Sequence, residues 1–343
     1  MKILRAKLVL IFLISILHMK AQLPLSDPTF TLVLHEEFNS FDPLLWHNQY
    51  TWRGPVNNGL EYNSPANLNY TLNTGYLTIK CETVSPITFT LGDYSPYNYQ
   101  SGVIQSKFTH KYGYFEISAK LPVGQGFWPA FWTLGGAPST CTAGIYNEID
   151  IMENNGDQSV SGTELGTHYH WRDINSCERT SASNIINGLA NMANEHKYAV
   201  FWEPNRMTWF FDDVPVAIIN DPTYTPQNAC CTIINFAIDP DPGRMPDGTT
   251  VFPAYYQINY LKIWQLIPDC NANPTFCSNF NAGTYVSKVK QSISIGGSGC
   301  SDNINTSGNI NFWATDFVLL DEGTTITDNG SGSFMAATTQ CPY

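Results

Sequence analysis

From Leu32 onward the chain consists of short apolar runs that alternate with turn-forming residues. The runs are rich in Val, Ile, Tyr, Phe and Thr, and Asn, Gly, Pro and Asp separate them. This spacing is typical of the strands of an all-β sandwich. We expect strands at 75–80, 113–121, 198–202, 207–211, 231–238 and 256–264. One helix candidate lies at 185–194, and we find neither an internal repeat nor a glycine-rich phosphate loop.

A change of composition at 268–277 divides the chain. Beyond it Ser, Gly, Thr and Asn predominate, and short apolar runs lie at 286–295, 310–315 and 317–320. We therefore predict one large β domain over 22–267, a linker over 268–277 and a small β-rich module over 278–343. This module resembles the short β-rich tails appended to secreted bacterial enzymes, and the resemblance implies sorting, surface attachment or binding. A spacer without a partner is an equally good interpretation.

The first residues have the pattern of an export signal. Lys2, Arg5 and Lys7 precede an apolar run from Leu8 to Leu17 that is too short to span a bilayer, and Ala21-Gln22 is a plausible cleavage site. Removing residues 1–21 would take the formal charge from −12 to −16. A chain this acidic is a poor partner for nucleic acid or an anionic membrane. We expect a secreted monomer with no membrane span.

Nine cysteines in an exported chain predict disulfide bonds, although the sequence does not fix their pairing. No CxxC pair occurs, which disfavours zinc. Reasonable pairs are Cys141–Cys177, Cys270–Cys277 and Cys300–Cys341, which leave Cys81 with the adjacent Cys230 and Cys231.

The stretch with the most chemical content is 147–153, which reads NEIDIME. Residues two apart on a strand share a face, so Glu148 and Asp150 project together. Glu153 is five positions from Glu148 and would face the other way on a regular strand. A β-bulge near 151–152 would return it to the same side and align three carboxylates.

Acidic residues along a strand usually mark a solvated face. Here charged residues make up only 13% of the chain, against roughly 25% in ordinary domains. Like charges at neighbouring positions on one face of a sheet are also destabilising. An aromatic stretch suited to stacking on sugar rings, 126–132 or GFWPAFW, lies about twenty residues upstream. These observations favour an active site that acts on carbohydrate.

The chain resembles glycoside hydrolase family 16 over most of residues 32–265. Besides the acidic and aromatic stretches, the matching segments are 32–39 with Trp46, 57–62 (NNGLEY), 112–116, 120–122, 166–169 (GTHY) and 257–264. The resemblance implies a β-jelly roll of two curved antiparallel sheets with a sugar-binding cleft. It also implies retaining hydrolysis of a β-linked polysaccharide, with the bulged motif of laminarinases, agarases and carrageenases.

By this resemblance Glu148 is the nucleophile, Glu153 the acid/base and Asp150 their helper. Retention independently requires two carboxyl groups about 5–5.5 Å apart, and a bulge shortens the separation of the two glutamates along the strand. Charge repulsion should raise the pKa of the acid/base. No cofactor is needed for this chemistry.

Several other residues are candidates for binding substrate. Trp128 and Trp132 share a strand face and suit stacking on pyranose rings, with core packing as the alternative. Trp52 and Asn58 lie in a polar loop, and His168 is expected in the cleft rather than on a metal. The candidates for substrate binding are therefore Trp128, Trp132, His168, Asn58 and Trp52.

A structural calcium ion is implied by the resemblance alone. Glu37 and Asn259 match positions where the family often holds calcium, although Asp is more usual than Asn at the second position.

Three positions depart from members that cut β-1,3-glucan. Those members often have arginines in place of Tyr114 and Ser118, and glutamate in place of Phe201. We expect Tyr114 and Ser118 to lie on the outer sheet.

The first functional hypothesis is a secreted endo-glycosidase acting on β-1,3- or mixed β-1,3/1,4-glucan. An endo-galactanase for agar- or carrageenan-type polymers is the alternative within enzymes. A sulfated substrate would favour basic residues along the cleft, and only 13 remain after cleavage of the signal. A non-catalytic lectin is the alternative from another class, but three crowded carboxylates would serve no purpose in it.

Overall fold

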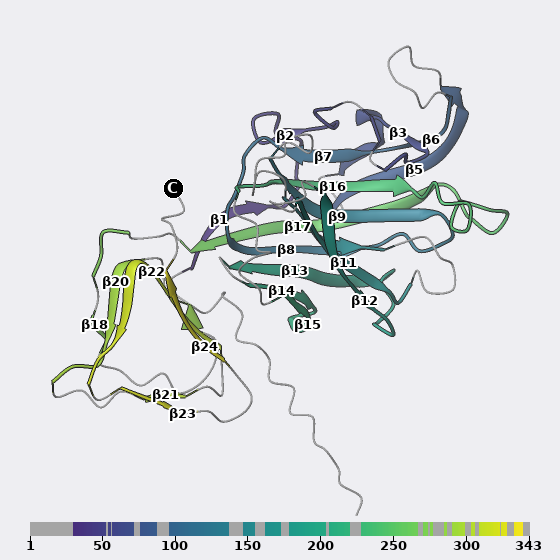
Figure 1. Cartoon of the computed structure of the whole chain (residues 1–343). Coiled ribbons are helices and arrows are strands. Elements are labelled where there is room, and N and C mark those ends of the chain that lie inside the picture. The colour runs from purple at the N-terminus through teal and green to yellow at the C-terminus, as the bar shows by residue number, and fades with distance from the viewer. Residues whose placement is uncertain are drawn as a thin grey trace, which may run out of the picture.

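Two large, largely antiparallel β-sheets form most of the protein in a computed structural model (Figure 1). The structure describes residues 30–52, 54–55, 57–71, 76–87, 96–136, 147–154, 162–172, 178–203, 206–219, 228–266, 270–273, 275–276, 285–286, 290–298, 303–305, 309–322, 324–327 and 333–338. The predicted signal peptide lies outside these residues. The all-β sandwich expected from the sequence is confirmed.

The larger sheet has ten strands in the order β15-β14-β13-β8-β17-β5-β6-β3, with β1 paired to β17 and β4 to β5. Its strands are β1 (Phe30–Glu36), β3 (Glu61–Asn63), β4 (Leu68–Thr71), β5 (Tyr76–Ile87), β6 (Tyr97–Ser101), β8 (Gly113–Lys120), β13 (Glu195–Glu203), β14 (Arg206–Phe211), β15 (Val214–Ile219) and β17 (Ala254–Leu266).

The second sheet has seven strands in the order β12-β11-β10-β9-β16-β7-β2. These are β2 (Trp46–His47), β7 (Val103–Ser106), β9 (Phe127–Gly135), β10 (Asn147–Glu153), β11 (Leu165–Arg172), β12 (Arg179–Ile186) and β16 (Cys231–Ile238). The NEIDIME stretch is β10, and it lies in the middle of this sheet between β9 and β11.

Alternation of apolar and polar residues explains how the two sheets pack. Every second side chain of a strand points between the sheets, and these side chains form one large core. On β10 the core residues are Ile149, Ile151 and Met152, at most 1% exposed. The indole Nε1 of Trp209 on β14 donates a 3.0 Å hydrogen bond to the Asp150 carbonyl, so the two sheets are also joined through the acidic strand.

The predicted helix at 185–194 is wrong. β12 continues to Ile186, which pairs with Leu165 of β11. The chain then turns at Gly188, whose φ of 74° suits glycine, and β13 begins at Glu195. Pairing with β11 therefore prevails over the local helical pattern.

The C-terminal strands pair in parallel. They are β18 (Thr275–Phe276), β19 (Tyr285–Val286), β20 (Lys290–Ile295), β21 (Asn303–Asn305), β22 (Asn309–Leu320), β23 (Thr325–Thr327) and β24 (Ser333–Thr338). Figure 1 shows them as three sides of a triangular coil. Its interior consists of Ile293, Ile295, Ile304, Ile310, Phe312 and Ala314.

This coil contains a repeat that the sequence analysis missed. Ile293 pairs with Val318, Ile304 with Ile326, and Ile310 with Phe334, so equivalent positions recur every 22 to 25 residues. Parallel stacking at a fixed period is the arrangement of a β-solenoid, in which each turn packs on the next. The apolar signal is one or two residues per strand, which is too weak to reveal the period by inspection.

The predicted disulfide pairs stay predictions. Cys81, Cys230 and Cys231 are free thiols, and Cys270 is disulfide-bonded. The other cysteines, Cys141, Cys177, Cys277, Cys300 and Cys341, lie outside the described residues. None of the described residues belongs to a helix long and apolar enough to cross a membrane.

Candidate active site

The predicted bulge is present on β10. Asp150 pairs with Trp132 of β9, but the next pair on that side is Met152 with Phe131, so Ile151 is the inserted residue. On the other side the register shifts between Asp150 and Glu153. The extra residue returns Glu153 to the face of the two earlier carboxylates.

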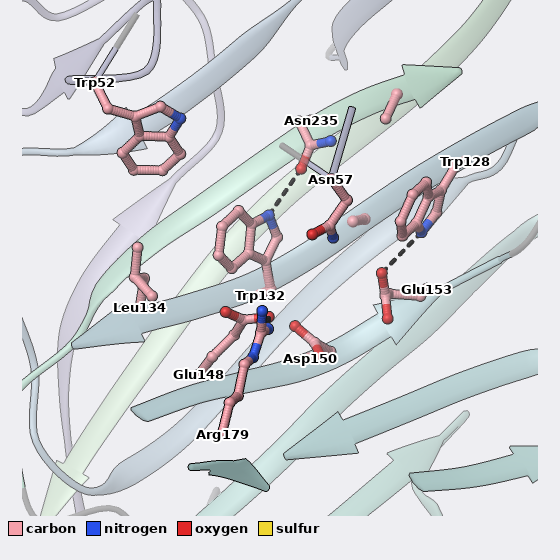
Figure 2. Close-up of a pocket in the computed structure, with 12 residues that line it drawn as sticks. Trp52, Asn57, Trp128, Trp132, Leu134, Glu148, Asp150, Glu153, Arg179 and Asn235 are labelled. Carbon is pink, nitrogen blue, oxygen red and sulfur yellow. Dashed lines mark hydrogen bonds and ion pairs between the residues drawn. The ribbon is translucent and has the colours of Figure 1, made fainter. Parts of the chain in front are cut away.

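All three carboxylates line one cavity of about 270 Å³ (Figure 2). β10 contributes the acids, and β9 and β16 contribute aromatic and amide side chains. The lining residues are Trp52, Asn57, Trp128, Ala130, Trp132, Leu134, Glu148, Asp150, Glu153, Arg179, Asn235 and Ala237. Indole rings beside a few polar groups are typical of a carbohydrate site.

Glu153 has a polar partner on each neighbouring strand. The indole Nε1 of Trp128 donates a 2.8 Å hydrogen bond to Oε1, and His168 Nε2 lies 3.2 Å from Oε2. The pKa of Glu153 is raised to about 7: burial raises it most, the Trp128 hydrogen bond opposes this effect, and the negative charge of Glu148 adds to the increase. A carboxyl with a pKa near 7 can donate a proton in one step and accept one in the next.

His168 is kept neutral beside this carboxyl. Burial, followed by the charge of His170, lowers the pKa of His168 to about 4. Its Nδ1 lies 2.8 Å from Ser183 Oγ on β12. The close approach of His168 to Glu153 depends on Gly166, because a Cβ at position 166 would lie only 2.9 Å from His168 Nε2.

Asp150 lies between the two glutamates and is only 4% exposed. Burial raises its pKa well above the usual value, and the charges of Glu153 and Glu148 add to this effect. His170 Nε2 lies 3.2 Å from Asp150 Oδ2, and burial lowers the pKa of that histidine. A protonated Asp150 would spare the site a third negative charge.

Glu148 has a cation beside it. Arg179 Nη2, at the start of β12, lies 3.1 Å from Glu148 Oε1, and His170 Nε2 is 3.8 Å from the same oxygen. Glu148 and Glu153 therefore have different surroundings, a guanidinium for the first and an indole and an imidazole for the second. Different surroundings for two carboxyl groups are what separate acid/base and nucleophilic roles.

The structure brings most predicted substrate residues to the cavity. Trp52, Trp128 and Trp132 line it. His168 is not among the lining residues, and it contacts Glu153 instead. Trp52 is 42% exposed and stacks on Tyr50 with ring centroids 4.6 Å apart, whereas Trp132 is 7% exposed. Trp132 thus combines core packing with a place in the cavity, and its Nε1 donates to Asn235 Oδ1 at 2.7 Å.

Asn58 does not line the cavity either, and Asn57 lines it in its place. Both asparagines have positive φ, 48° and 61°, in a tight turn. Such a turn rotates consecutive side chains away from one another, so the motif indicated the loop correctly but not which asparagine faces the cleft.

Sequence reasoning missed Arg179, Asn235 and the contact of His170 with Asp150. Asn235 pairs with Ala130 of β9, and only the order of the strands brings its side chain to the indole Nε1 of Trp132. Arg179 follows a stretch with no recognisable motif. The one available signal was its rarity, since the chain has only 17 Lys and Arg.

The cavity acids do not have the surroundings of a metal site. Ligand atoms of Glu148, Asp150 and His170 lie within 4.8 Å of one another. However, Arg179 pairs with Glu148 and would repel a cation there. These contacts favour proton transfer chemistry.

The predicted calcium residues do not share a site among the described contacts. Glu37 Oε1 lies 3.4 Å from His35, and Asn259 Nδ2 donates to Glu195 Oε1 at 2.6 Å. Calcium needs six to eight oxygen ligands, so two residues with different partners are a poor fit to it.

Comparison with known proteins decides the family. A family model described as "Glycosyl hydrolases family 16" matches residues 56–240, more than half of the chain. The chain belongs to glycosyl hydrolases family 16. Members of this family need no catalytic cofactor.

Relatives within family 16 share both sequence and fold. The chain is 31% identical over 212 residues to the endo-1,3-1,4-beta-glycanase ExsH of Rhizobium meliloti (strain 1021), covering 61% of this chain and 42% of that protein. It is 28% identical over 267 residues to the beta-glucanase of Rhodothermus marinus, covering 70% and 87%. The crystal structure of a LamA variant from Z. galactanivorans with laminaritriose and laminaritetraose has a TM-score of 0.58 and 28% identity, covering 68% of this chain and 99% of that one. The chain spans less than half the length of the first of these relatives.

Proposed function

We propose that the protein is a secreted, retaining endo-glycosidase that hydrolyses β-1,3- or mixed β-1,3/1,4-glucan. The observation that carries the proposal is the set of three carboxylates that the bulge of β10 brings to one aromatic cavity. The endo-1,3-1,4-beta-glycanase and beta-glucanase relatives, and the laminarin oligosaccharides bound by the LamA variant, support a β-glucan as the substrate.

In the proposed reaction Glu148 attacks the anomeric carbon while Glu153 protonates the departing glycosidic oxygen. A covalent glycosyl–Glu148 ester forms and the glycosidic bond breaks. Glu153, now ionised, removes a proton from water, which displaces Glu148 from the sugar. The proton returns to Glu153, and the β configuration is retained after two inversions.

The aromatic residues would hold the polymer across this pair. Trp52 and Trp128 offer indole faces at different places in the cavity, and Asn57 and Asn235 offer amides (Figure 2). Stacking suits the apolar faces of glucose rings, and amides suit their hydroxyls. A neutral glucan needs no further positive charge from the protein.

Secretion belongs to the same proposal, as does a role of the C-terminal coil in sorting, surface attachment or binding. The basic and apolar N-terminal pattern supports export, and an extracellular enzyme can reach a polymer too large to enter a cell.

The experiment that tests the proposal is release of reducing ends from laminarin, lichenan, agarose and carrageenan. We expect release from laminarin or lichenan, with oligosaccharides of several lengths as early products. Release from agarose or carrageenan alone would replace the glucanase with a galactanase. Binding to any of the four without release would indicate a lectin.

A further inference from the structure

A fully buried acid that takes no part in the proposed chemistry contacts the segments that line the cavity. Glu61 is the first residue of β3 and is 0% exposed. Its Oε2 accepts a 2.8 Å hydrogen bond from the backbone N–H of Ile238, the last residue of β16. Ile238 directly follows Ala237, which lines the cavity. The carboxyl of Glu61 is therefore attached to the end of a cavity strand.

The turn that carries Asn57 packs on the same carboxyl. Asn57 lines the cavity, and Gly59 lies two residues further along the turn. A Cβ at Gly59 would lie 2.7 Å from Glu61 Oε2 and 3.0 Å from Oε1, so the backbone of the turn is in direct contact with the carboxyl. The backbone N–H of Leu60 donates to the Ile238 carbonyl at 3.1 Å. The turn and the end of β16 are thus joined on both sides of Glu61.

Trp52 is connected to Glu61 through Tyr50. The buried ring of Tyr50 stacks on the indole of Trp52 with centroids 4.6 Å apart. Burial raises the pKa of Tyr50 well above its usual value, and the nearby charge of Glu61 raises it further. Figure 2 shows Trp52 and Asn57 apart from the acids of β10. One segment, 50–61, therefore carries two cavity side chains that are separate from the reacting carboxyl groups.

We propose that Glu61 is a positioning residue that holds the segment carrying Trp52 and Asn57 against the end of β16, and so sets how tightly the polysaccharide is bound. This inference rests on the proposed function, in which Trp52 and Asn57 contact the polymer. The reacting acids lie on β10, so loss of Glu61 should change KM and leave kcat nearly unchanged.

Stabilisation of the fold explains this acid less well. Burial raises the pKa of Glu61 from 4.5 to about 8, although hydrogen bonds with Ile238 and Asn63 oppose the increase. The folded chain therefore keeps a proton that the unfolded chain releases above pH 4.5, so Glu61 lowers stability as pH rises from about 4.5 to about 8. The titratable groups that face it, Tyr50 and the Cys81 thiol of β5, have pKa values raised by burial and by its charge, and supply no positive charge. An apolar side chain at position 61 would avoid this cost.

The first test compares kcat and KM of the wild type, Glu61→Ala and Glu116→Ala on laminarin or lichenan, whichever is cut. Glu116 is the matched control, because it is a buried acid of the same sheet, 2% exposed, whose pKa is also raised by burial. Its Oε1 accepts a hydrogen bond from the Tyr260 hydroxyl at 2.8 Å and does not contact a cavity segment. We expect KM to rise roughly three- to tenfold in Glu61→Ala, the effect of about one lost hydrogen bond, with kcat within about twofold.

Two outcomes of this comparison would overturn the proposal. An equal rise of KM in Glu116→Ala would reduce the effect to a general loss of packing. A lower kcat with unchanged KM would place the influence of Glu61 on the reacting groups instead. Glu61→Gln keeps the test informative if Glu61→Ala does not fold, because glutamine has the shape of the protonated acid and still accepts the Ile238 hydrogen bond. We expect wild-type KM in Glu61→Gln near neutral pH.

A measurement without substrate separates this inference from the proposed function. The indole ¹H–¹⁵N resonance of Trp52, assigned by its loss in Trp52→Phe, can be followed against pH in the wild type, Glu61→Gln and Glu116→Gln. We expect a movement with a midpoint at about 8 in the wild type and Glu116→Gln that is absent from Glu61→Gln. Any movement caused by Glu153, with its pKa of about 7, would persist in all three proteins. This result would support the proposed role even if none of the four polysaccharides were cut. The same titration curve in the wild type and Glu61→Gln would overturn it even if the protein proved to be a glucanase.

Discussion

At the scale of single residues, the two glutamates on β10 differ in what surrounds them, and their replacement should show it. Glu148→Ala should abolish turnover of every substrate, because no covalent intermediate can form. Glu153→Ala should slow cleavage of polysaccharide by about 10²–10⁴-fold, the usual contribution of acid/base catalysis. An aryl β-glycoside with a good leaving group needs no protonation, so it should still form the intermediate in Glu153→Ala.

Azide distinguishes the two roles in the same experiment. It should speed breakdown of the intermediate in Glu153→Ala and yield a β-glycosyl azide, because azide attacks without a general base. Rescue of Glu148→Ala with a β-glycosyl azide would instead exchange the two assignments. An α-glycosyl azide from Glu148→Ala would agree with Glu148 as the nucleophile, because azide would then displace the leaving group directly from the face that the Glu148 carboxylate occupied. Wild-type rates in both variants would show that the carboxylates of β10 do not take part in catalysis.

The two tryptophans of β9 make a matched pair for testing the pKa of Glu153. Trp128 Nε1 donates to Glu153 and opposes the effect of burial, which leaves the pKa of Glu153 at about 7, whereas Trp132 Nε1 donates to Asn235. Activity that needs protonated Glu153 should decline as pH rises through about 7 in the wild type. Trp128→Phe removes the opposing hydrogen bond, so the alkaline limb of kcat/KM should move upward.

Trp132→Phe serves as the control for this limb. It also removes an indole from the cavity but leaves the donor to Glu153 in place. We expect weaker substrate binding with an unmoved alkaline limb. If the alkaline limb of kcat/KM lay at the same pH in Trp128→Phe and Trp132→Phe, the Trp128 hydrogen bond would not affect the pKa of Glu153.

At the scale of elements, the strand-to-strand fit of β10 and β11 sets the contact between Glu153 and His168. Gly166 pairs with Glu153, and a Cβ at 166 would lie 2.9 Å from His168 Nε2. Gly166→Ala should therefore displace the imidazole and lower kcat several-fold with little change in KM. Gly248→Ala is the matched control, because a Cβ there meets nothing within 4 Å. Equal kcat values in the two variants would mean that the imidazole tolerates the displacement.

The sequence predicted elements where the pattern was local. The apolar runs located β5, β8, β13, β14, β16 and β17, and the break of the period of two at Glu153 located the bulge at Ile151. Contacts that depend on the order of strands could not be derived in this way. Arg179 reaches Glu148 only because β12 follows β11 at the edge of the sheet, and Asn235 reaches Trp132 only because β16 lies next to β9.

At the scale of the whole molecule, the C-terminal coil covers part of the larger sheet on the side away from the cavity. Trp313 of β22 is fully buried in a cluster with Tyr114, Phe201 and Phe210, against which Met335 and Ala337 of β24 also pack. Ser118, further along β8, instead contacts Glu195 at 2.5 Å. Tyr114 and Phe201 thus support the contact with the coil, and their departure from the usual charged residues is no argument against a glucan substrate.

Trp313 should therefore join the coil to the sandwich, and its replacement tests that contact. Trp313→Ala removes a fully buried indole, a change that typically costs about 3–5 kcal/mol in a core. We expect earlier thermal unfolding of the full chain, with glycosidase activity at low temperature unchanged because the cavity lies on the other sheet. Phe317→Ala, on the same strand but with its ring 50% exposed, is the control and should leave the unfolding temperature within a degree or two. Equal unfolding temperatures for the wild type and Trp313→Ala would show that the coil does not rely on this contact. Loss of activity together with stability would show instead that the coil supports the cleft through the larger sheet.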